Sequence, residues 1–234
     1  MDADSRPLKQ IPERPMPRTL NSPKGTRKNI AGVVLAAGSS RRMGEANKLM
    51  IPVDGTPMVA RVVDALRDGG VEKVFVVTGY APEEIRGALG DRDVETVHNP
   101  DYEEGLGSSV RTGVSAVGDD VDGVLIALGD MPWVDEDVIS RLLDAFGPDG
   151  ELSIYIPMFG RRRGNPVLWS SHHFAELRQL SGDVGGKALF HKHPEAICYV
   201  DVQSAAVNID VDTPESLREL GIDGLDAPQR KEPP

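Results

Sequence analysis

Between residues 30 and 158, short apolar runs alternate with longer segments in which apolar residues recur every three or four positions. The short runs are typical of strands buried on both faces, and the longer period is typical of amphipathic helices. This alternation predicts βαβ units and an α/β fold with a Rossmann-like, mostly parallel sheet flanked by helices. The predicted strands are Ile30–Ala36, Lys73–Thr78, Val94–His98, Val124–Leu128 and Ser153–Met158, and the predicted helices are Pro57–Arg67, Pro82–Leu89, Ser108–Val117 and Asp135–Phe146.

The alternation breaks after Met158. The stretch Gly160–Trp169 predicts a turn that leads into a strand, and a helix and short strands follow, among them a late strand at Val207–Ile209. Four histidines lie in this part of the chain, and no serine or acidic motif joins them, so we expect packed or solvated side chains at His172, His173, His191 and His193.

Both ends of the chain differ in composition from the middle. Residues 1–29 contain prolines at 7, 12, 15, 17 and 23, seven basic and three acidic residues, and no apolar periodicity. Such a segment cannot bury enough apolar surface to fold, so it predicts a disordered basic tail. Residues 222–234 predict a second disordered tail, and residues 30–221 a single folded domain between them.

The charge and the cysteine content exclude several classes of protein. A net charge of -11 over 234 residues argues against a general binder of nucleic acid or membrane surfaces. No apolar run approaches the roughly 20 residues that span a bilayer, and no apolar segment typical of a signal peptide follows the first basic residues. The single cysteine, Cys198, excludes an intramolecular disulfide, and a reducing cytoplasm is the expected location.

The first predicted strand ends in a loop of small residues followed by cations. Leu35, Ala36, Ala37 and Gly38 are followed by Ser40 and Arg42, and Lys48 lies a little downstream. Small residues let a backbone approach a bulky ligand, and backbone N–H groups with nearby cations hold phosphate oxygens. The spacing fits neither the dinucleotide fingerprint nor the Walker loop. We therefore expect a phosphate site of another type at this strand end.

Two acidic positions follow later strands. Asp130 comes directly after a strand, beside Gly129, and Asp210 follows the predicted late strand. Ligands of open α/β sheets bind at the carboxyl ends of the strands, and carboxylates are the ligands that Mg²⁺ prefers. These two residues are the candidate metal ligands. Asp212 or Thr213 is predicted to cap the final helix at Pro214.

Several motifs together resemble the MobA-like nucleotidyltransferases, and most closely their molybdenum cofactor cytidylyltransferase branch. The resemblance covers roughly Ile30 to Leu220. It rests on LAAGSSRRMG (35–44) with Lys48, GLGSSVRTG (105–113), LGDMP (128–132), GRRRGNPV (160–167), GDVGGKAL (182–189) and DVDTPE (210–215).

The resemblance implies a fold of the nucleotide-diphospho-sugar transferase type and a Mg²⁺-dependent transfer of a nucleoside monophosphate. In the branch most like this chain the donor is CTP, the acceptor is the phosphate of the molybdenum pterin cofactor, and pyrophosphate is released. Ala37 favours CTP, since guanylyl-transferring relatives tend to have glycine there. A molybdenum hydroxylase apoenzyme is an implied partner.

Site residues follow from the same resemblance. Arg42, Lys48 and Asp130 would be catalytic, and Asp130 and Asp210 would hold the metal. The nucleotide would contact Leu35, Ala36, Ala37, Gly38, Ser40, Arg42, Lys48, Gly105, Ser108, Ser109, Gly129 and Asp130. The acceptor would contact Arg163, Asn165, Asp183 and Lys187.

Some of these positions have a structural alternative or depart from the family. Ser108 also fits the N-cap of the helix that follows it, and Arg163 fits an exposed hairpin tip. Asn165 and Lys187 stand where relatives often have histidine and arginine.

Three other functions remain open. The donor could be GTP or the acceptor another phosphorylated compound. The chain could be a non-catalytic carrier of the cofactor for a molybdenum hydroxylase. It could also be an NAD(P)H oxidoreductase, against which the missing dinucleotide fingerprint argues.

Overall fold

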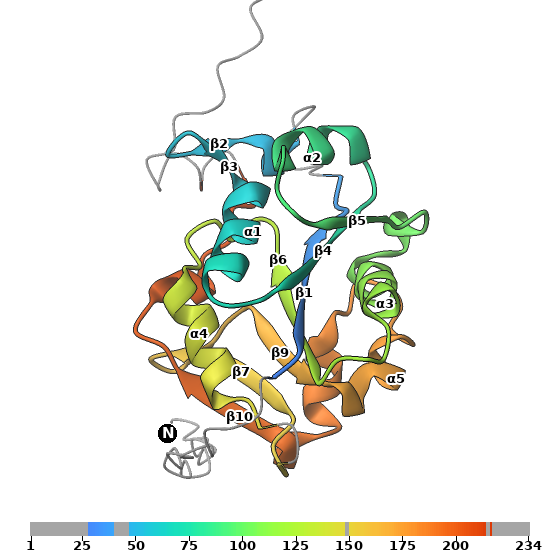
Figure 1. Ribbon diagram of the computed structural model, residues 1–234. Coiled ribbons are helices and arrows are strands. Elements are labelled where there is room, and N and C mark those ends of the chain that lie inside the picture. The colour runs from blue at the N-terminus through green and yellow to red at the C-terminus, as the bar shows by residue number, and fades with distance from the viewer. Residues whose placement is uncertain (1–27, 40–46, 148–149, 214–215, 217–234) are drawn as a thin grey trace, which may run out of the picture.

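The structure is a computed structural model that describes residues 28–39, 47–147, 150–213 and 216. An eight-stranded sheet forms its centre, in the order β10-β7-β9-β6-β1-β4-β5, with β8 paired to β7 off this path (Figure 1). The strands are β1 (Ile30–Ala36), β4 (Lys73–Thr78), β5 (Glu95–His98), β6 (Gly123–Leu128), β7 (Ile154–Phe159), β8 (Arg162–Arg163), β9 (Val167–Ser170) and β10 (Ile197–Asp201). A separate hairpin joins β2 (Pro52–Val53) to β3 (Thr56–Pro57).

The sheet is mostly parallel, as predicted. The central strand β1 pairs in parallel with β4 on one side and with β6 on the other, and β4 continues in parallel to β5. The exceptions are β9, which lies antiparallel between β6 and β7, and the short β8, which pairs antiparallel with β7. The chain turns after Phe159 and runs back as β9. The GRRRGNPV segment at this turn therefore lies at the edge of the sheet where β6 has its carboxyl end.

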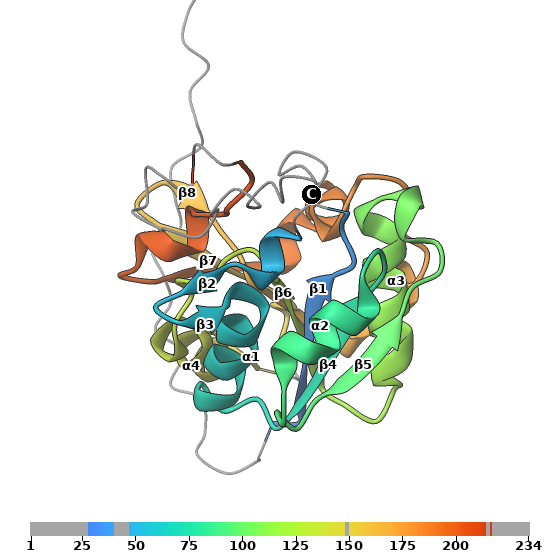
Figure 2. The ribbon, with the colours of Figure 1, turned by 90° about the horizontal axis from the view of Figure 1, so that it is seen from above.

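Helices cover both faces of the sheet. They are α1 (Met58–Asp68), α2 (Pro82–Leu89), α3 (Leu106–Val117), α4 (Glu136–Ala145) and α5 (Phe174–Leu177). Short 3-10 helices connect them: η2 (Lys48–Met50), η3 (Tyr102–Glu104), η4 (Ser171–His173), η5 (Gly186–His191), η6 (Pro194–Ala196) and η7 (Ala205–Asn208). Figures 1 and 2 show α1 and α4 on one side of β1 and α3 on the other.

Alternate side chains of β1 enter two apolar cores. Val34 packs in the core beneath α1, α2 and α4, and Val33 and Leu35 pack in the core beneath α3 and α5. Both valines are fully buried. A strand that buries both faces must be apolar at every position, and this explains the uninterrupted apolar run in the sequence.

Several predicted boundaries differ from the structure, mostly by one residue, and three of the differences change how a segment is interpreted. The late strand predicted at Val207–Ile209 is wrong, because the segment forms η7, where the Ser204 hydroxyl accepts a hydrogen bond from the Ala206 N–H. Helix α3 begins two residues before Ser108, with Gly105 as its N-cap, so Ser108 is not a cap. Helix α1 begins after Pro57, which belongs to β3.

The last two residues of the predicted N-terminal tail contact the folded domain. The Lys28 ammonium donates to the Leu143 carbonyl at 2.7 Å, and the Asn29 N–H donates to the Asp122 carboxylate at 2.8 Å. Residues 1–27 and 217–234 lie outside the described residues. Within the described ranges, no helix combines the length and the apolar character needed to cross a membrane.

Leu142 tests the core between α4 and the sheet. Its side chain is fully buried in the core beneath α1 and α4. Leu142→Ala should lower the free energy of unfolding by about 2–5 kcal/mol, because it removes apolar burial and leaves a cavity. Urea denaturation measures the change. Val184→Ala, at a side chain that is 52% exposed, should change it by less than about 0.5 kcal/mol. Equal losses in both variants would contradict this packing.

Candidate active site

A cleft of about 730 Å³ opens at the carboxyl ends of β1 and β6. Figure 2 looks onto this edge of the sheet. The Gly129 N–H donates to the Leu35 carbonyl at 3.0 Å, and this bond joins the ends of the two strands. The cleft is lined by Leu35, Ala37, Gly38, Ser39, Lys48, Leu49, Tyr102, Glu103, Gly105, Leu106, Ser109, Leu128, Asp130, Asp183 and Asp212.

Lys48 occupies a fixed position at one end of the cleft. It begins η2, whose N-cap Asn47 accepts a hydrogen bond from the Leu49 N–H, and Leu49 is buried in the core. The Lys48 ammonium lies 2.7 Å from Oδ2 of Asp130 and 2.7 Å from Oδ1 of Asp212. The lysine therefore joins a carboxylate at the end of β6 to one near the C-terminus.

The segment that carries Asp212 is fixed by its neighbour. Val211 is fully buried against Ile51 and Val53 of the β2–β3 hairpin region, and its N–H donates to the Asp130 carbonyl at 3.0 Å. These contacts place the acidic residues on either side of Val211 beside Asp130.

The capping role predicted for Asp212 or Thr213 belongs to Thr213. The Thr213 N–H donates to Oγ of Ser216, and the Ser216 N–H donates to Oγ1 of Thr213, at 3.1 and 3.2 Å. This reciprocal pair is the arrangement of a capping box. The carboxylate of Asp212 is therefore not the cap; it lines the cleft and pairs with Lys48.

Burial and charge shift the pKa values of the pair in the cleft. Burial raises the pKa of Asp130, and the nearby charges of Asp212 and Asp210 add to the increase, while Lys48 opposes it. Burial by itself lowers the pKa of Lys48, but Asp130 and Asp212 together outweigh it and the pKa is raised. Lys48 is a cation at neutral pH, and Asp130 is held in an environment that disfavours further negative charge.

The second carboxylate oxygen of Asp130 is a candidate ligand for a cation. Oδ1 is buried, and it has no hydrogen-bond partner among the described residues. A desolvated carboxylate oxygen left unpaired is unfavourable by about 1–3 kcal/mol or more. Asp212 lies across Lys48, and the exposed Asp210 is close enough to raise the pKa of Asp130. This all-oxygen set suits Mg²⁺ or Mn²⁺, which are held by a few carboxylates together with substrate phosphates.

A buried asparagine supports the opposite wall. Asn99 is fully buried, and its side-chain amide donates to the hydroxyls of Ser108 and Ser109 at 2.9 and 3.1 Å. The Ser108 hydroxyl also lies 2.8 and 2.9 Å from the carbonyl oxygens of Asp101 and Gly105, so its hydrogen bonds hold the loop. Of the two serines, Ser109 lines the cleft.

Two glycine-containing loops meet at this wall. The Gly107 N–H donates to the Gly182 carbonyl at 2.8 Å. Gly105 has a φ of 101°, and a Cβ there would lie 2.6 Å from the Gly182 carbonyl carbon and 2.7 Å from the Asp183 nitrogen. Only glycine satisfies both the backbone conformation and the close approach. The contact brings Asp183 to the cleft.

The remaining predicted residues divide into three groups. Ala36 is buried in the core, and Gly129 forms the joint between the strand ends. Ser40 and Arg42 lie outside the described residues. Arg163, Asn165 and Lys187 do not line the cleft, and the guanidinium of Arg163 lies 5.1 Å from the centre of the Tyr199 ring.

Sequence reasoning missed several residues of the cleft. Asp212 could have been found, because it lies two positions after Asp210 in DVDTPE and Val211 between them is apolar. Leu106 lies inside GLGSSVRTG but was not among the predicted contacts, and no motif points to Tyr102 or Glu103, which line the cleft, or to Asn99, which supports its wall.

The matching family model is that of the MobA-like NTP transferase domain, over residues 32–197. The chain belongs to the MobA-like NTP transferase family. The resemblance stated from the motifs is therefore confirmed, and with it the nucleotidyltransferase class.

Two curated relatives have different activities in their names. A nicotine blue oxidoreductase of Paenarthrobacter nicotinovorans is 28% identical over 82% of this chain and 96% of its own length. The molybdenum cofactor cytidylyltransferase of Escherichia coli K12 is 28% identical over 79% of this chain and 92% of its own.

Among solved structures, Rv0371c of Mycobacterium tuberculosis H37Rv is 30% identical, with a TM-score of 0.70 over 82% of this chain and 98% of its own. A further structure of Rv0371c is a complex with manganese.

Opposite shifts in the pKa of Asp130 test the charge arrangement. Lys48→Met should raise this pKa further, because it removes the cation that favours the carboxylate, and Asp210→Asn should lower it, because it removes a like charge. A pH titration of the Asp130 side-chain carbon by NMR measures both. Asp137→Asn, in the first turn of α4, is the matched control and should leave it unchanged. Shifts of the same sign in the first two variants would refute the arrangement.

Proposed function

We propose that the protein is a Mg²⁺-dependent nucleotidyltransferase that transfers CMP from CTP to the phosphate of the molybdenum pterin cofactor. The observation that carries the proposal is the Lys48 ammonium held between Asp130 and Asp212 in the cleft, beside a buried carboxylate oxygen that lacks a partner among the described residues. A polyphosphate carries several negative charges, so the Lys48 ammonium and a metal ion on the Asp130 carboxylate would together neutralise it.

In the proposed reaction an oxygen of the acceptor phosphate attacks the α-phosphorus of CTP. A new P–O bond forms, the bond between the α- and β-phosphates breaks, and pyrophosphate leaves with the electron pair. Lys48 would bind the α-phosphate, exchanging a carboxylate contact for a phosphate contact, and Arg42 would bind the leaving β- and γ-oxygens. Such a transfer requires that the reacting groups are positioned and that the phosphate charge is neutralised. A lysine held in place by two carboxylates can do both.

Asp130 would hold Mg²⁺, with Asp210 as the second carboxylate. The ion, when bound, neutralises phosphate oxygens and the charge that develops on the leaving group. The manganese complex of Rv0371c supports a divalent cation in this family. Asp212 is a further candidate ligand, since its carboxylate is already directed at Lys48.

The substrates are proposed from the sequence and the relatives. Ala37, which lines the cleft, and the cytidylyltransferase relative favour CTP. The cytosine nucleoside would lie against Gly105 and Ser109. Asp183 borders the same cleft, and the acceptor would extend from it towards Lys187, Arg163 and Asn165. A molybdenum hydroxylase would receive the product in the cytoplasm.

The relative named as an oxidoreductase favours a second candidate function, reduction of an organic substrate. This candidate needs a nicotinamide or flavin cofactor, and the loop from Ala37 lacks the dinucleotide fingerprint. An absorbing cofactor in the purified protein, together with no pyrophosphate release, would support the second candidate over the first.

A nucleotide-selectivity assay tests the proposed function. The protein is incubated with Mg²⁺, the molybdenum pterin cofactor and each of CTP, GTP, ATP and UTP, and released pyrophosphate is measured. CTP should give the fastest release. Lys48→Met should lower kcat/KM by about 10²–10³-fold, because a preorganised charge at the transferred phosphate is lost. Asp130→Asn should cause a similar loss.

The matched control is Lys73→Met. Lys73 is exposed at the start of β4, at the opposite end of that strand from the cleft, and pairs with Glu95. This variant should keep the wild-type rate. Faster release with GTP would overturn the choice of donor, and no release with any nucleotide would overturn the transferase proposal.

A further inference from the structure

A cluster of two histidines and a glutamate lies away from the cleft. His173 ends η4, Glu176 belongs to α5, and His193 precedes η6. Ser153, which contacts His173, comes directly before β7, so the cluster lies near the amino end of that parallel strand. The cleft lies at the carboxyl ends of the strands. His173 is packed, as expected, but it and His193 also meet Ser153 and Glu176, partners that no sequence motif indicated.

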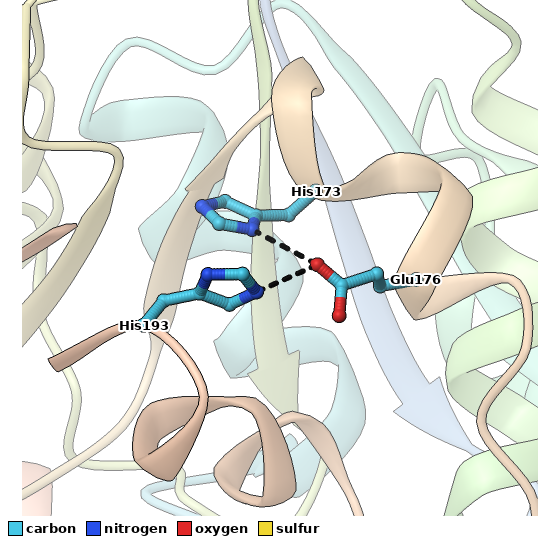
Figure 3. A group of neighbouring side chains, drawn as sticks. All are labelled: His173, Glu176 and His193. Atoms are coloured by element: carbon cyan, nitrogen blue, oxygen red, sulfur yellow. Dashed lines mark hydrogen bonds and ion pairs between the residues drawn. The ribbon is translucent and has the colours of Figure 1, made fainter.

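The two imidazoles face one carboxylate oxygen (Figure 3). Nε2 of His193 lies 2.6 Å from Oε1 of Glu176, and Nδ1 of His173 lies 3.9 Å from the same oxygen. One ligand atom from each residue lies within 4.8 Å of the others. His173 and Glu176 lie three positions apart on the continuous η4–α5 segment, and His193 reaches them from the segment before η6.

We propose that His173, Glu176 and His193 bind a divalent transition-metal ion of the zinc class, with water in the remaining position. Two imidazoles and one carboxylate are a ligand set that Zn²⁺ takes in proteins. Mg²⁺ is disfavoured, because it prefers oxygen ligands.

The distances fit this ion after a small shift of Glu176. Ligand atoms around a tetrahedral zinc ion with bonds of about 2.0–2.2 Å lie about 3.3–3.6 Å apart. The observed separations from Oε1, 2.6 Å to His193 and 3.9 Å to His173, fall on either side of that value. A sideways movement of the carboxylate by less than 1 Å, on the scale of these bond lengths, equalises them. Glu176 is partly exposed and has room to move.

The surroundings orient the ligands. Oγ of Ser153 lies 2.8 Å from Nε2 of His173, which leaves Nδ1 directed at the cluster. Such a bond to the second ring nitrogen is typical of metal-binding histidines. Burial lowers the pKa of His173, which favours the neutral imidazole that a metal ion requires. The Lys192 ammonium, 3.5 Å from Oε2, satisfies the second oxygen of Glu176.

The same residues do not form a hydrolytic triad. The 3.9 Å between His173 and Glu176 is too long for a hydrogen bond that would orient the base. Ser153 is only 8% exposed, so its hydroxyl is closed to a substrate. A metal site explains the convergence without requiring access to Ser153.

Metal titration of the full chain, without an affinity tag and after removal of metal with EDTA, tests the site. Co²⁺ is the spectroscopic probe and Zn²⁺ the competitor, with excess Mg²⁺ present to occupy the carboxylates of the cleft. The wild-type protein should bind one Co²⁺ with the visible absorption of a tetrahedral nitrogen-containing site, and Zn²⁺ should displace it. His193→Gln and Glu176→Gln should each weaken binding at least about tenfold, and Ser153→Ala by about 10–100-fold.

Two controls separate this site from others. His191→Gln changes an exposed histidine outside the cluster and should keep the wild-type affinity. Asp130→Asn should also keep it, because the cleft is a different site. Zn²⁺ should raise the melting temperature of the wild type and not of His193→Gln. Absence of binding in the wild type, or unchanged affinity in both His193→Gln and Glu176→Gln, would overturn the proposal.

Discussion

The arrangement of the cleft depends on one ammonium group. Lys48 bonds to Asp130, 82 positions away, and to Asp212, 164 positions away. Without a cation between them, these two carboxylates and the nearby Asp210 would repel one another in a partly buried site. The buried carboxylate oxygen of Asp130 still requires a positive partner. Among the described residues that line the cleft, the negative charge gathers around Lys48, and a metal ion with a polyphosphate is the ligand pair proposed to complete the site.

Apolar packing holds these charges in place. Val211 anchors the C-terminal segment against the β2–β3 hairpin, and Leu49 anchors the short helix that carries Lys48. On the opposite wall, the buried Asn99 amide donates hydrogen bonds to the hydroxyls of Ser108 and Ser109 in α3. Lys48, Asp212 and Ser109 are therefore each next to a buried group, and this support holds the like charges of the cleft together without separation of the segments that carry them.

The sequence predicted the elements whose signal is local. The apolar runs of β1 and β4 are buried on both faces, and Asp130 follows a strand whose end is easily recognised. Features that depend on distant contacts were not predictable. The antiparallel return of β9 follows from the pairing of Val124 with Trp169, and the role of Asp212 from Lys48. The 3-10 turn at Val207 has a local cap, Ser204, but the apolar residues Val207 and Ile209 also fit a short strand. Glu176 lies three positions after His173, but His193 is twenty positions from His173 and meets the pair only in the folded chain, so spacing alone could not add it.

The two ends of the sheet carry different ligand chemistry. At the carboxyl end the cleft offers carboxylate oxygens and a lysine, which suit hard cations shared with phosphate. Near the amino end of β7, His173 and His193 offer imidazole nitrogens, which suit softer ions. The cleft therefore favours Mg²⁺ or Mn²⁺, and the histidine cluster favours ions of the zinc class. A metal ion bound at the amino-end site would link Glu176 of α5 to His193, which precedes β10. This link would restrict the movement of these two segments relative to each other. The exchange of Mg²⁺ with each nucleotide would then leave that link unchanged.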